Sequence, residues 1–242
     1  MLKVCCIIAN YNHLRYLEES IRSAMAQTWQ DLEILVVDDG SDDQPAVCNL
    51  VTKLQTEEDD RIVYLQLPHN TGKWNALNKA IEQTNCQLIT TLDADDTCLP
   101  ERIERQVAAL TATNAAHVLT GFHHCWSDEE ITKLTAKSFG VHNLRIVQRA
   151  EVREQVLAGR QTPGINHYFT GQIETAGASA MFARDVWEMG IRFNPPGVGT
   201  RVLLSEDSDF NFRATALLGV TVILDEKLYC YRRNTSTNKE EM

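Results

Sequence analysis

The acidic segment Asp93-Ala94-Asp95-Asp96 is the part of the sequence whose residue types most directly predict chemistry. It follows Leu88-Ile89-Thr90-Thr91-Leu92, a short apolar run typical of a buried strand. Carboxylates this close together repel one another unless a cation or the hydroxyl groups of a ligand satisfy them. The segment therefore indicates a cation or ligand site at the end of a strand, although an isolated D-x-D is also typical of a solvated acidic turn.

Three more polar clusters in the first half of the chain each follow an apolar run. They are Asn10–Asn12 after Val4–Ala9, Asp38–Ser41 after Leu32–Val37, and Asn70–Lys73 after Ile62–Leu67. Apolar residues at helical spacing separate the runs, and they predict helices over Leu14 to about Gln27, over Pro45–Leu54, around Leu77, and from Pro100 through Leu110.

This alternation of strands and helices, without two-residue hairpin turns, predicts an α/β fold with a mostly parallel central sheet flanked by helices. In open sheets of this type, ligands bind beyond the carboxyl ends of the strands. All four polar clusters are expected at that edge.

The second half of the chain has a weaker pattern, and residues 126–175 follow no clear period. The predicted elements are strands over His117–Phe122, Ala176–Phe182, Val220–Leu224 and Leu228–Tyr231, a helical stretch over Ala150–Leu157, a loop over Pro195–Gly199 and a helix behind Ser205. The run Ala176–Phe182 begins with small residues, which indicates a strand whose backbone is closely approached.

The composition excludes several classes of protein. The chain of 242 residues has a net charge of −10, which argues against nucleic acid as a partner because phosphate binding needs a basic face. Seven cysteines, without a C-x-x-C pair, predict a reduced, cytoplasmic setting. We find neither a signal-peptide pattern nor the roughly 18 consecutive apolar residues of a membrane span. Peripheral membrane contact and the oligomeric state stay open.

The order of these motifs resembles family 2 of the glycosyltransferases, which are inverting enzymes of the GT-A (nucleotide-diphospho-sugar transferase) fold. The resemblance runs from about Lys3 to Arg233 and is weak over residues 126–175. The segments that carry it are Ile7–His13, Ile34–Asp42, Asn70–Asn78, Leu92–Asp96 with Pro100, and Ser205–Phe210 with Arg213. It implies a single domain over 1–242, with a nucleotide-sugar half over 1–125 and an acceptor half over 126–242.

The resemblance also implies a binding site for a nucleotide-diphospho-sugar, most simply a UDP-sugar. Its residues would be Asn10, Tyr11, Asp39, Lys73, Asp93, Ala94 and Arg233. Asp39 would accept a hydrogen bond from the uracil ring, with an Asx turn around Gly40 as the alternative. Tyr11 would pack on the base, or it is simply an aromatic residue at the end of a strand. A dTDP- or GDP-sugar stays open.

By the same resemblance, Asp93 would contact the ribose and Asp95 would hold a divalent cation that bridges the two phosphates. Hard oxygen ligands and a diphosphate suit Mg²⁺ or Mn²⁺. The cation would act as a Lewis acid on the departing diphosphate. Asp96 would orient the loop or serve as a secondary ligand, and the alternative is an acidic residue at a helix N-terminus.

Asp207 is the candidate general base, because an inverting displacement must remove a proton from the acceptor hydroxyl group. The first turn of a helix favours its ionised form. Glu206 would instead be a hydrogen-bond partner of the acceptor, a saccharide or a lipid-linked molecule. Helix-capping charge is the alternative for both residues.

Three cations are candidates for contacts with the diphosphate, with a solvated surface role as the alternative for each: Lys73, Arg232 and Arg233. The chain has Asn234 where many family members have a histidine after the terminal Tyr-Arg. The Q-x-x-R-W segment of processive members is absent, so a polymer-extruding synthase is not expected. Several aromatic side chains could line an acceptor site, although each is more simply a core or surface residue and the histidines are assigned no role: Trp126, His123, His124, His142, His167, Tyr168 and Trp187.

Three competing interpretations are weaker. A nucleotidyltransferase would need a glycine-rich basic loop after the first strand, and Asn10–His13 is not such a loop. A dinucleotide-dependent oxidoreductase would need G-x-G-x-x-G at the same place. A nucleotide-sugar-binding scaffold without turnover stays open, because Asn234 replaces the histidine.

Overall fold

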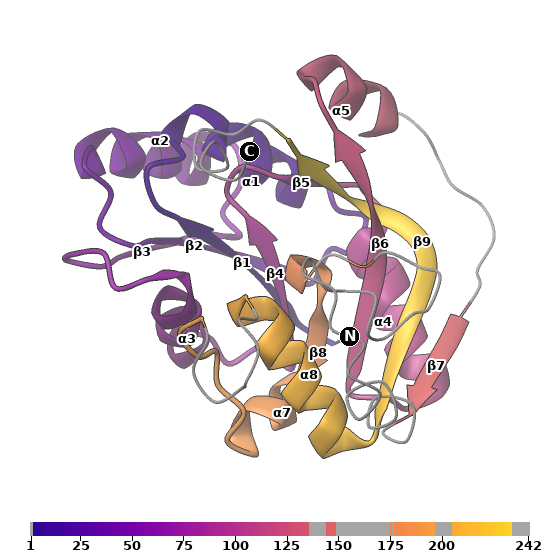
Figure 1. The fold of residues 1–242 in the computed structure, drawn as a ribbon. Helices are drawn as coiled ribbons and strands as arrows, with labels where there is room; N and C mark the ends of the chain where they lie inside the picture. Colours follow the sequence, from indigo (N-terminus) through magenta and orange to yellow (C-terminus); the bar gives the residue numbers. More distant parts are fainter. Residues whose placement is uncertain (1, 136–143, 149–174, 176, 197–204, 234–242) are drawn as a thin grey trace.

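The computed structural model describes residues 2–135, 144–148, 175, 177–196 and 205–233 (Figure 1). The strands are β1 Val4–Asn10, β2 Leu32–Asp38, β3 Ile62–Gln66, β4 Leu88–Asp93, β5 Thr97–Cys98, β6 His117–Cys125, β7 Leu144–Gln148, β8 Met181–Ala183 and β9 Val220–Arg232. The helices are α1 Leu14–Met25, α2 Gln44–Glu57, α3 Lys73–Gln83, α4 Arg102–Thr113, α5 Asp128–Thr135, α7 Arg184–Glu188 and α8 Glu206–Leu218, with a 3₁₀ turn, η2, over Gly177–Ser179.

The first half of the chain forms the predicted parallel arrangement. Strand β1 pairs in parallel with β2 and with β4, and β2 pairs in parallel with β3. Strands β1 and β2 are apolar and buried along almost their whole length, as expected of strands that are covered on both faces. The carboxyl ends of β1, β2 and β4 therefore lie at one edge of the sheet.

The second half of the chain extends the same sheet but mixes strand directions. The order of the hydrogen-bonded strands is β3-β2-β1-β4-β8-β6-β9-β5, with β7 paired to β9. Strand β8 is antiparallel to both β4 and β6, so β6 points in the same direction as β4. Strand β9 is parallel to β6 and also ends at the edge where β4 ends.

Two apolar cores cover the two faces of the sheet. On one face, β1, β2 and β4 pack against α1, α2 and α4 through residues such as Ile8, Leu17 and Ile103. On the other face, α3, α7 and α8 pack on the sheet through residues such as Ile7, Leu77 and Phe210. The result is a layered α/β structure with helices on both faces (Figure 1).

Three of the predicted strands differ from the structure. The segment predicted as one strand from Ala176 to Phe182 contains the 3₁₀ turn η2, and its strand begins only at Met181. The predicted strands Val220–Leu224 and Leu228–Tyr231 are a single strand, β9. The polar residues between them alternate in burial, since Asp225 and Lys227 are exposed whereas Glu226 is buried.

The predicted helices need smaller corrections. Pro100 is not the first residue of a helix, because α4 begins at Arg102 and Glu101 is its N-cap. Ser205 is the N-cap of α8, as predicted, and its side chain accepts a hydrogen bond from the backbone N–H of Ser208. The short elements β5, β7, α5 and α7 were not predicted. The helical stretch expected at Ala150–Leu157 lies outside the described residues.

His117, at the start of β6, is fully buried between the sheet and α8. Its Nδ1 lies 2.9 Å from Thr221 Oγ1, and its Nε2 lies 3.0 Å from Asn211 Oδ1. Burial lowers the pKa of His117 from 6.5 to about 4. The folded protein therefore holds this ring in the neutral form.

We expect His117 to make the folded protein less stable in weak acid. Between pH 6.5 and about 4 the unfolded chain binds a proton at this residue that the folded chain does not, so the free energy of unfolding falls as the pH falls. From pH 7.5 to pH 5 the loss should be roughly 2 kcal/mol. Urea unfolding of the wild type and of His117→Gln at both pH values measures it. Equal losses in the two proteins would contradict the assignment.

Candidate functional site

A cavity of about 280 Å³ opens at the carboxyl edge of the sheet, where the polar clusters meet. Its lining comes from the ends of β1 and β4, from the segment that leads into α3, and from Asp39 after β2. The lining residues are Ala9, Asn10, Tyr11, His13, Asp39, Asn70, Gly72, Lys73, Ala76, Asp93, Ala94 and Asp95. Seven of the residues predicted to bind the donor or a metal are among them: Asn10, Tyr11, Asp39, Lys73, Asp93, Ala94 and Asp95.

Asn10 joins the ends of β1 and β2. Its Nδ2 donates hydrogen bonds to Asp38 Oδ1 at 2.7 Å and to Ser41 Oγ at 3.1 Å. Its buried Oδ1 has no hydrogen-bond partner among the described residues. Asn10 thus stabilises one wall of the cavity, and its Oδ1 can still accept a hydrogen bond from a ligand.

Asp39 holds the loop that leads into α3. Its Oδ1 accepts hydrogen bonds from the backbone N–H and the hydroxyl group of Thr71, and its Oδ2 accepts one from the N–H of Gly72 at 2.8 Å. The Asx-type contact in this region belongs instead to Asp38, whose Oδ2 accepts from the N–H of Ser41. Asp39 therefore lies against the loop that forms the opposite wall of the cavity.

Gly40 lets this loop approach the end of β2. It has a φ of +72°, and a Cβ at this position would lie 2.4 Å from the backbone carbon of His69. Only glycine accepts both the left-handed conformation and the close contact. Tyr11, on the other wall, is 38% exposed, so its ring can meet a ligand in the cavity.

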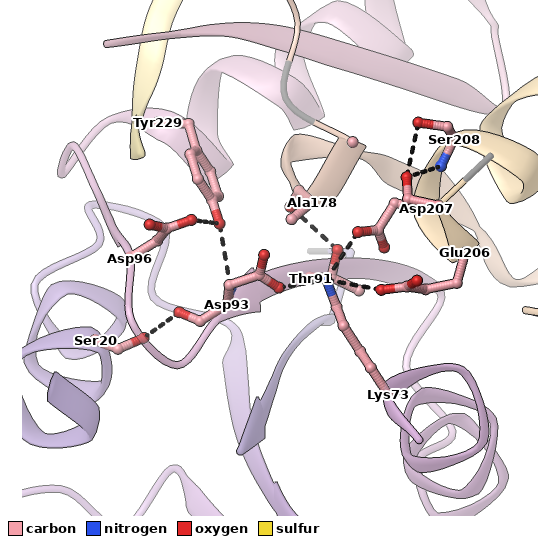
Figure 2. A network of polar contacts seen from close by, with 12 residues as sticks. Ser20, Lys73, Thr91, Asp93, Asp96, Ala178, Glu206, Asp207, Ser208 and Tyr229 are labelled. Atoms are coloured by element: carbon pink, nitrogen blue, oxygen red, sulfur yellow. Dashed lines mark hydrogen bonds and ion pairs between the residues drawn. The ribbon is translucent and has the colours of Figure 1, made fainter. Parts of the chain in front are cut away.

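Lys73 lies at the centre of the site, among three carboxylates from distant parts of the chain (Figure 2). Its Nζ is 2.6 Å from Asp93 Oδ1, 2.8 Å from Asp207 Oδ2 and 3.6 Å from Glu206 Oε1. Asp93 ends β4, whereas Glu206 and Asp207 begin α8. One ammonium group therefore connects the cavity to the residues predicted to act in catalysis.

Burial and the neighbouring charges have opposing effects on the pKa values of Lys73 and Asp207. Burial acts to lower the pKa of Lys73, but Asp207, Asp93 and Glu206 raise it well above its ordinary value. Burial raises the pKa of Asp207 to about 6, and Lys73 limits that rise. Asp207 is thus ionised at neutral pH because of Lys73 and in spite of its burial.

The position of Asp207 is set by its neighbours as well as by the helix. It lies in the first turn of α8, behind the N-cap Ser205. A Cβ on Gly177 would lie only 2.7 Å from Asp207 Cβ, so the 3₁₀ turn η2 packs directly against this residue. The expected close approach to the small residues after Ala176 is therefore observed at Gly177. Asp207 Oδ1 is buried and has no hydrogen-bond partner among the described residues.

The acidic segment after β4 brings three carboxylates together. One oxygen from each of Asp93, Asp95 and Asp96 lies within 4.8 Å of the others. Asp96 is buried, and its oxygens accept hydrogen bonds from the hydroxyl group of Tyr229 and from the N–H of Arg232, both at 2.7 Å. Burial, together with Asp93 and Asp95, raises the pKa of Asp96 well above its ordinary value.

Asp96 therefore orients the loop, one of the two roles expected for it. The alternative, an acid at a helix N-terminus, is wrong because Asp96 precedes β5 and α4 begins only at Arg102. The three carboxylates supply the hard oxygen atoms that Mg²⁺ and Mn²⁺ prefer, so the residues present fit such an ion. Asp95 lines the cavity, and we regard it as the primary candidate ligand.

The two arginines at the end of β9 do not line the cavity. Arg232 is buried, forms ion pairs with Glu19 and Asp128, and donates a hydrogen bond from Nε to the backbone oxygen of Asp95. It thus anchors the acidic loop from behind. Arg233, predicted to contact the donor, instead lies beside His124 and Trp126. Asn234 lies outside the described residues.

The remaining aromatic candidates have separate places. Trp187 is a core residue, only 4% exposed. His123 and His124 belong to β6, and Trp126 follows it. His142, His167 and Tyr168 lie outside the described residues.

Sequence reasoning missed two residues that shape the site, Tyr229 and Gly177. Tyr229 donates to Asp96 and accepts a hydrogen bond from the N–H of Asp93 at 3.2 Å. No local pattern marks Tyr229, because its hydrogen-bond partner Asp96 lies 133 residues earlier in the chain. Gly177 had a weak signal in the run of small residues around it.

Comparison with known sequences identifies related proteins. The sequence profile described as glycosyl transferase family 2 matches residues 5–182. An uncharacterized glycosyltransferase of Nostoc is 35% identical over 123 residues, which are 51% of this chain and 36% of the relative. One from Methanocaldococcus jannaschii is 35% identical over 104 residues, which are 43% of this chain and 35% of the relative. The match thus spans about a third of the length of these relatives.

Solved structures show the same fold. The structure of S. aureus TarS in complex with UDP-GlcNAc has a TM-score of 0.69 at 17% identity and covers 97% of this chain and 60% of that one. The mannosyltransferase PcManGT from Pyrobaculum calidifontis, in complex with GDP-Man and Mn²⁺, has a TM-score of 0.61 at 19% identity, with coverage of 95% and 56%. Both comparisons support the predicted GT-A fold. No helix among the described residues is long and apolar enough to cross a membrane.

Proposed function

Since the chain belongs to glycosyl transferase family 2, we propose that it transfers one sugar, with inversion, from a nucleotide-diphospho-sugar to a hydroxyl group of a saccharide or lipid-linked acceptor. The observation that carries this proposal is the position of Asp207. Its carboxylate is ion-paired through Lys73 to Asp93 at the cavity, and its second oxygen is buried without a described partner. A general base must lie within hydrogen-bond reach of the acceptor hydroxyl group, which meets the donor at its sugar, and it needs an oxygen that can take the proton.

The donor would occupy the cavity, with its base between Tyr11 and Asp39 and its ribose near Asp93. One lone pair of Asp39 Oδ2 stays available beside the hydrogen bond from Gly72, and it suits a ring N–H of uracil. The TarS structures with UDP and with UDP-GlcNAc support a UDP-sugar as the first choice. The PcManGT complex makes a GDP-sugar the alternative to test.

Asp95 would hold a Mg²⁺ or Mn²⁺ ion, with Asp93 next to it in the same group of carboxylates. When bound, such an ion offsets the negative charge that develops on the departing diphosphate. Lys73 adds a second positive charge at the same end of the cavity. Arg232 keeps the backbone of Asp95 in place through its hydrogen bond to the carbonyl oxygen.

In the chemical step, the acceptor oxygen attacks the anomeric carbon as the bond from that carbon to the diphosphate oxygen breaks. The hydroxyl proton passes to Asp207, and the nucleoside diphosphate leaves with the bonding electron pair. Glu206, 3.6 Å from Lys73, would accept a hydrogen bond from the acceptor. General-base catalysis of this kind contributes on the order of 10²–10⁴-fold to the rate.

A titration calorimetry experiment tests the donor half of this proposal. We expect UDP to bind in the presence of Mn²⁺, more tightly than dTDP or GDP. Asp95→Ala should weaken binding at least tenfold and remove its dependence on Mn²⁺, because it deletes the primary carboxylate ligand.

Asp225→Ala is the matched control, since Asp225 is an exposed aspartate on β9. It should bind UDP as the wild type does. If none of the three nucleotides binds to the folded protein with Mn²⁺ present, the proposed transferase function is wrong.

The pH dependence of turnover tests the role of Asp207. The base must be ionised, and its pKa is about 6, so kcat/KM for the acceptor should fall as the pH drops below about 6. Lys73→Met should move this fall to higher pH, because Lys73 is the group that lowers the pKa of Asp207. Asp207→Asn should reduce kcat by about 10²-fold or more.

Turnover that survives in Asp207→Asn would assign the base to another residue. A wild-type protein that binds UDP and Mn²⁺ but neither transfers nor hydrolyses a UDP-sugar would support the scaffold alternative instead.

A further inference from the structure

Four side chains outside the donor cavity form a compact aromatic and basic cluster at the ends of β6 and β9. We call His124, Trp126, Tyr231 and Arg233 the β6–β9 cluster. The guanidinium carbon of Arg233 lies 4.7 Å from the centre of the Tyr231 ring and 6.0 Å from that of Trp126. Its Nε donates a hydrogen bond to His124 Nδ1 at 2.9 Å. These contacts hold the guanidinium plane in one orientation.

The β6–β9 cluster lies at the edge of the sheet where the donor cavity opens. Strands β4, β6 and β9 all point toward that edge. Arg233 follows directly on Arg232, which donates hydrogen bonds to the backbone oxygen of Asp95 and to the carboxylate of Asp96. The cluster is therefore about one strand spacing away from the acidic loop.

Tyr231 anchors the β6–β9 cluster to the interior of the protein. Its ring packs against the apolar core between the sheet and α1, α2 and α4. The neighbouring Arg232 points toward α1, where it pairs with Glu19 and stacks on Tyr16. The cluster therefore stands on this core, beside the residue that anchors the acidic loop.

Two features of the β6–β9 cluster indicate a ligand of defined chemistry. The indole of Trp126 is 62% exposed, and its backbone N–H is held by Glu130 Oε2 at 2.7 Å. No carboxylate among the described residues pairs with Arg233, although the protein has a net charge of −10. A guanidinium group held beside an open aromatic face can pair with a carboxylate or phosphate in a bidentate manner while the ring packs on an apolar surface.

From this arrangement we infer that the β6–β9 cluster is an acceptor subsite for an acidic saccharide. One sugar ring packs on Trp126, and the carboxylate or phosphate group of that saccharide pairs with Arg233. This inference rests on the proposed function, because it treats the edge of the sheet beside the acidic loop as the place where the acceptor binds. It moves Arg233 from the donor site, where the sequence motif had placed it, to the acceptor site.

Equilibrium binding tests the subsite without the need for turnover. The probes are a glucuronic-acid-containing disaccharide, glucose 6-phosphate and the neutral disaccharide N,N′-diacetylchitobiose, each titrated with UDP and Mn²⁺ present. We expect at least one acidic probe to bind and the neutral one to bind at least tenfold more weakly. The stronger of the two acidic probes identifies the anionic group as a carboxylate or a phosphate.

The variants assign this binding to the cluster. Trp126→Ala and Arg233→Ala should each weaken the acidic probe at least tenfold, and Arg233→Lys should recover only part of the loss, since an ammonium group cannot form the bidentate pair. The matched control is Arg15→Ala, because Arg15 also lies over an aromatic ring, Tyr16, but outside the cluster. UDP affinity should be unchanged in all four variants.

Three results would overturn the inference: no binding of either acidic probe, undiminished binding in both alanine variants, or a loss of UDP affinity in Arg233→Ala. The UDP titration separates this outcome from failure of the proposed function. Normal UDP binding without saccharide binding contradicts the subsite alone, whereas saccharide binding without UDP binding contradicts the donor proposal alone.

Discussion

The site depends on one ammonium group placed among three carboxylates. Asp93 lies at the end of β4, whereas Glu206 and Asp207 lie at the start of α8, more than 100 residues later in the chain. The three carboxylates would repel one another without a cation between them. Lys73 supplies that cation from the first turn of α3. Removing one partner of this partly buried charge network leaves the others uncompensated, which is costly, so the network constrains where α8 can lie relative to β4.

The sheet topology makes this contact geometrically available. Strand β8 inserts between β4 and β6, and the 3₁₀ turn η2 before it lies against both neighbours. Thr91 of β4 donates a hydrogen bond to the carbonyl oxygen of Ala178 (Figure 2). The adjacent Gly177 packs on Asp207. Because η2 contacts both β4 and Asp207, the start of α8 lies near the end of β4. The cavity and the candidate base become parts of one edge although they belong to opposite halves of the sequence.

The sequence predicts the first half of the fold well, for reasons that are local. Val4–Ala9 is apolar at every position and Leu32–Val37 at every position except Glu33, because both faces of these strands are buried, and a run of that kind is easily recognised. The polar residues that follow each strand come together because parallel strands end at one edge. The cavity lined by Asn10, Asp39 and Asp93 is a direct consequence.

The second half was harder to predict because long-range contacts decide it. The polar residues of β9 led to a prediction of two strands instead of one. Glu226, one of these residues, is buried, and its Oε2 lies 3.8 Å from Nε of Arg105 in α4. Strand β5 has only two residues and exists because Thr97 and Cys98 pair with β9. The contact between Lys73 and Asp207 joins residues 134 positions apart. Motif order indicated both residues, but no local pattern showed that they meet.

The most direct test of this account is a double-mutant cycle on Lys73 and Asp207, read as the free energy of unfolding in urea at pH 7.5. Lys73→Met alone should destabilise the protein, and Asp207→Asn should then recover part of the loss by removing one uncompensated carboxylate. We predict a coupling energy of about 1–3 kcal/mol. The exposed pair Lys79 and Glu82 is the control, with an expected coupling below about 0.5 kcal/mol. A coupling between Lys73 and Asp207 no larger than that of the control pair would contradict the account.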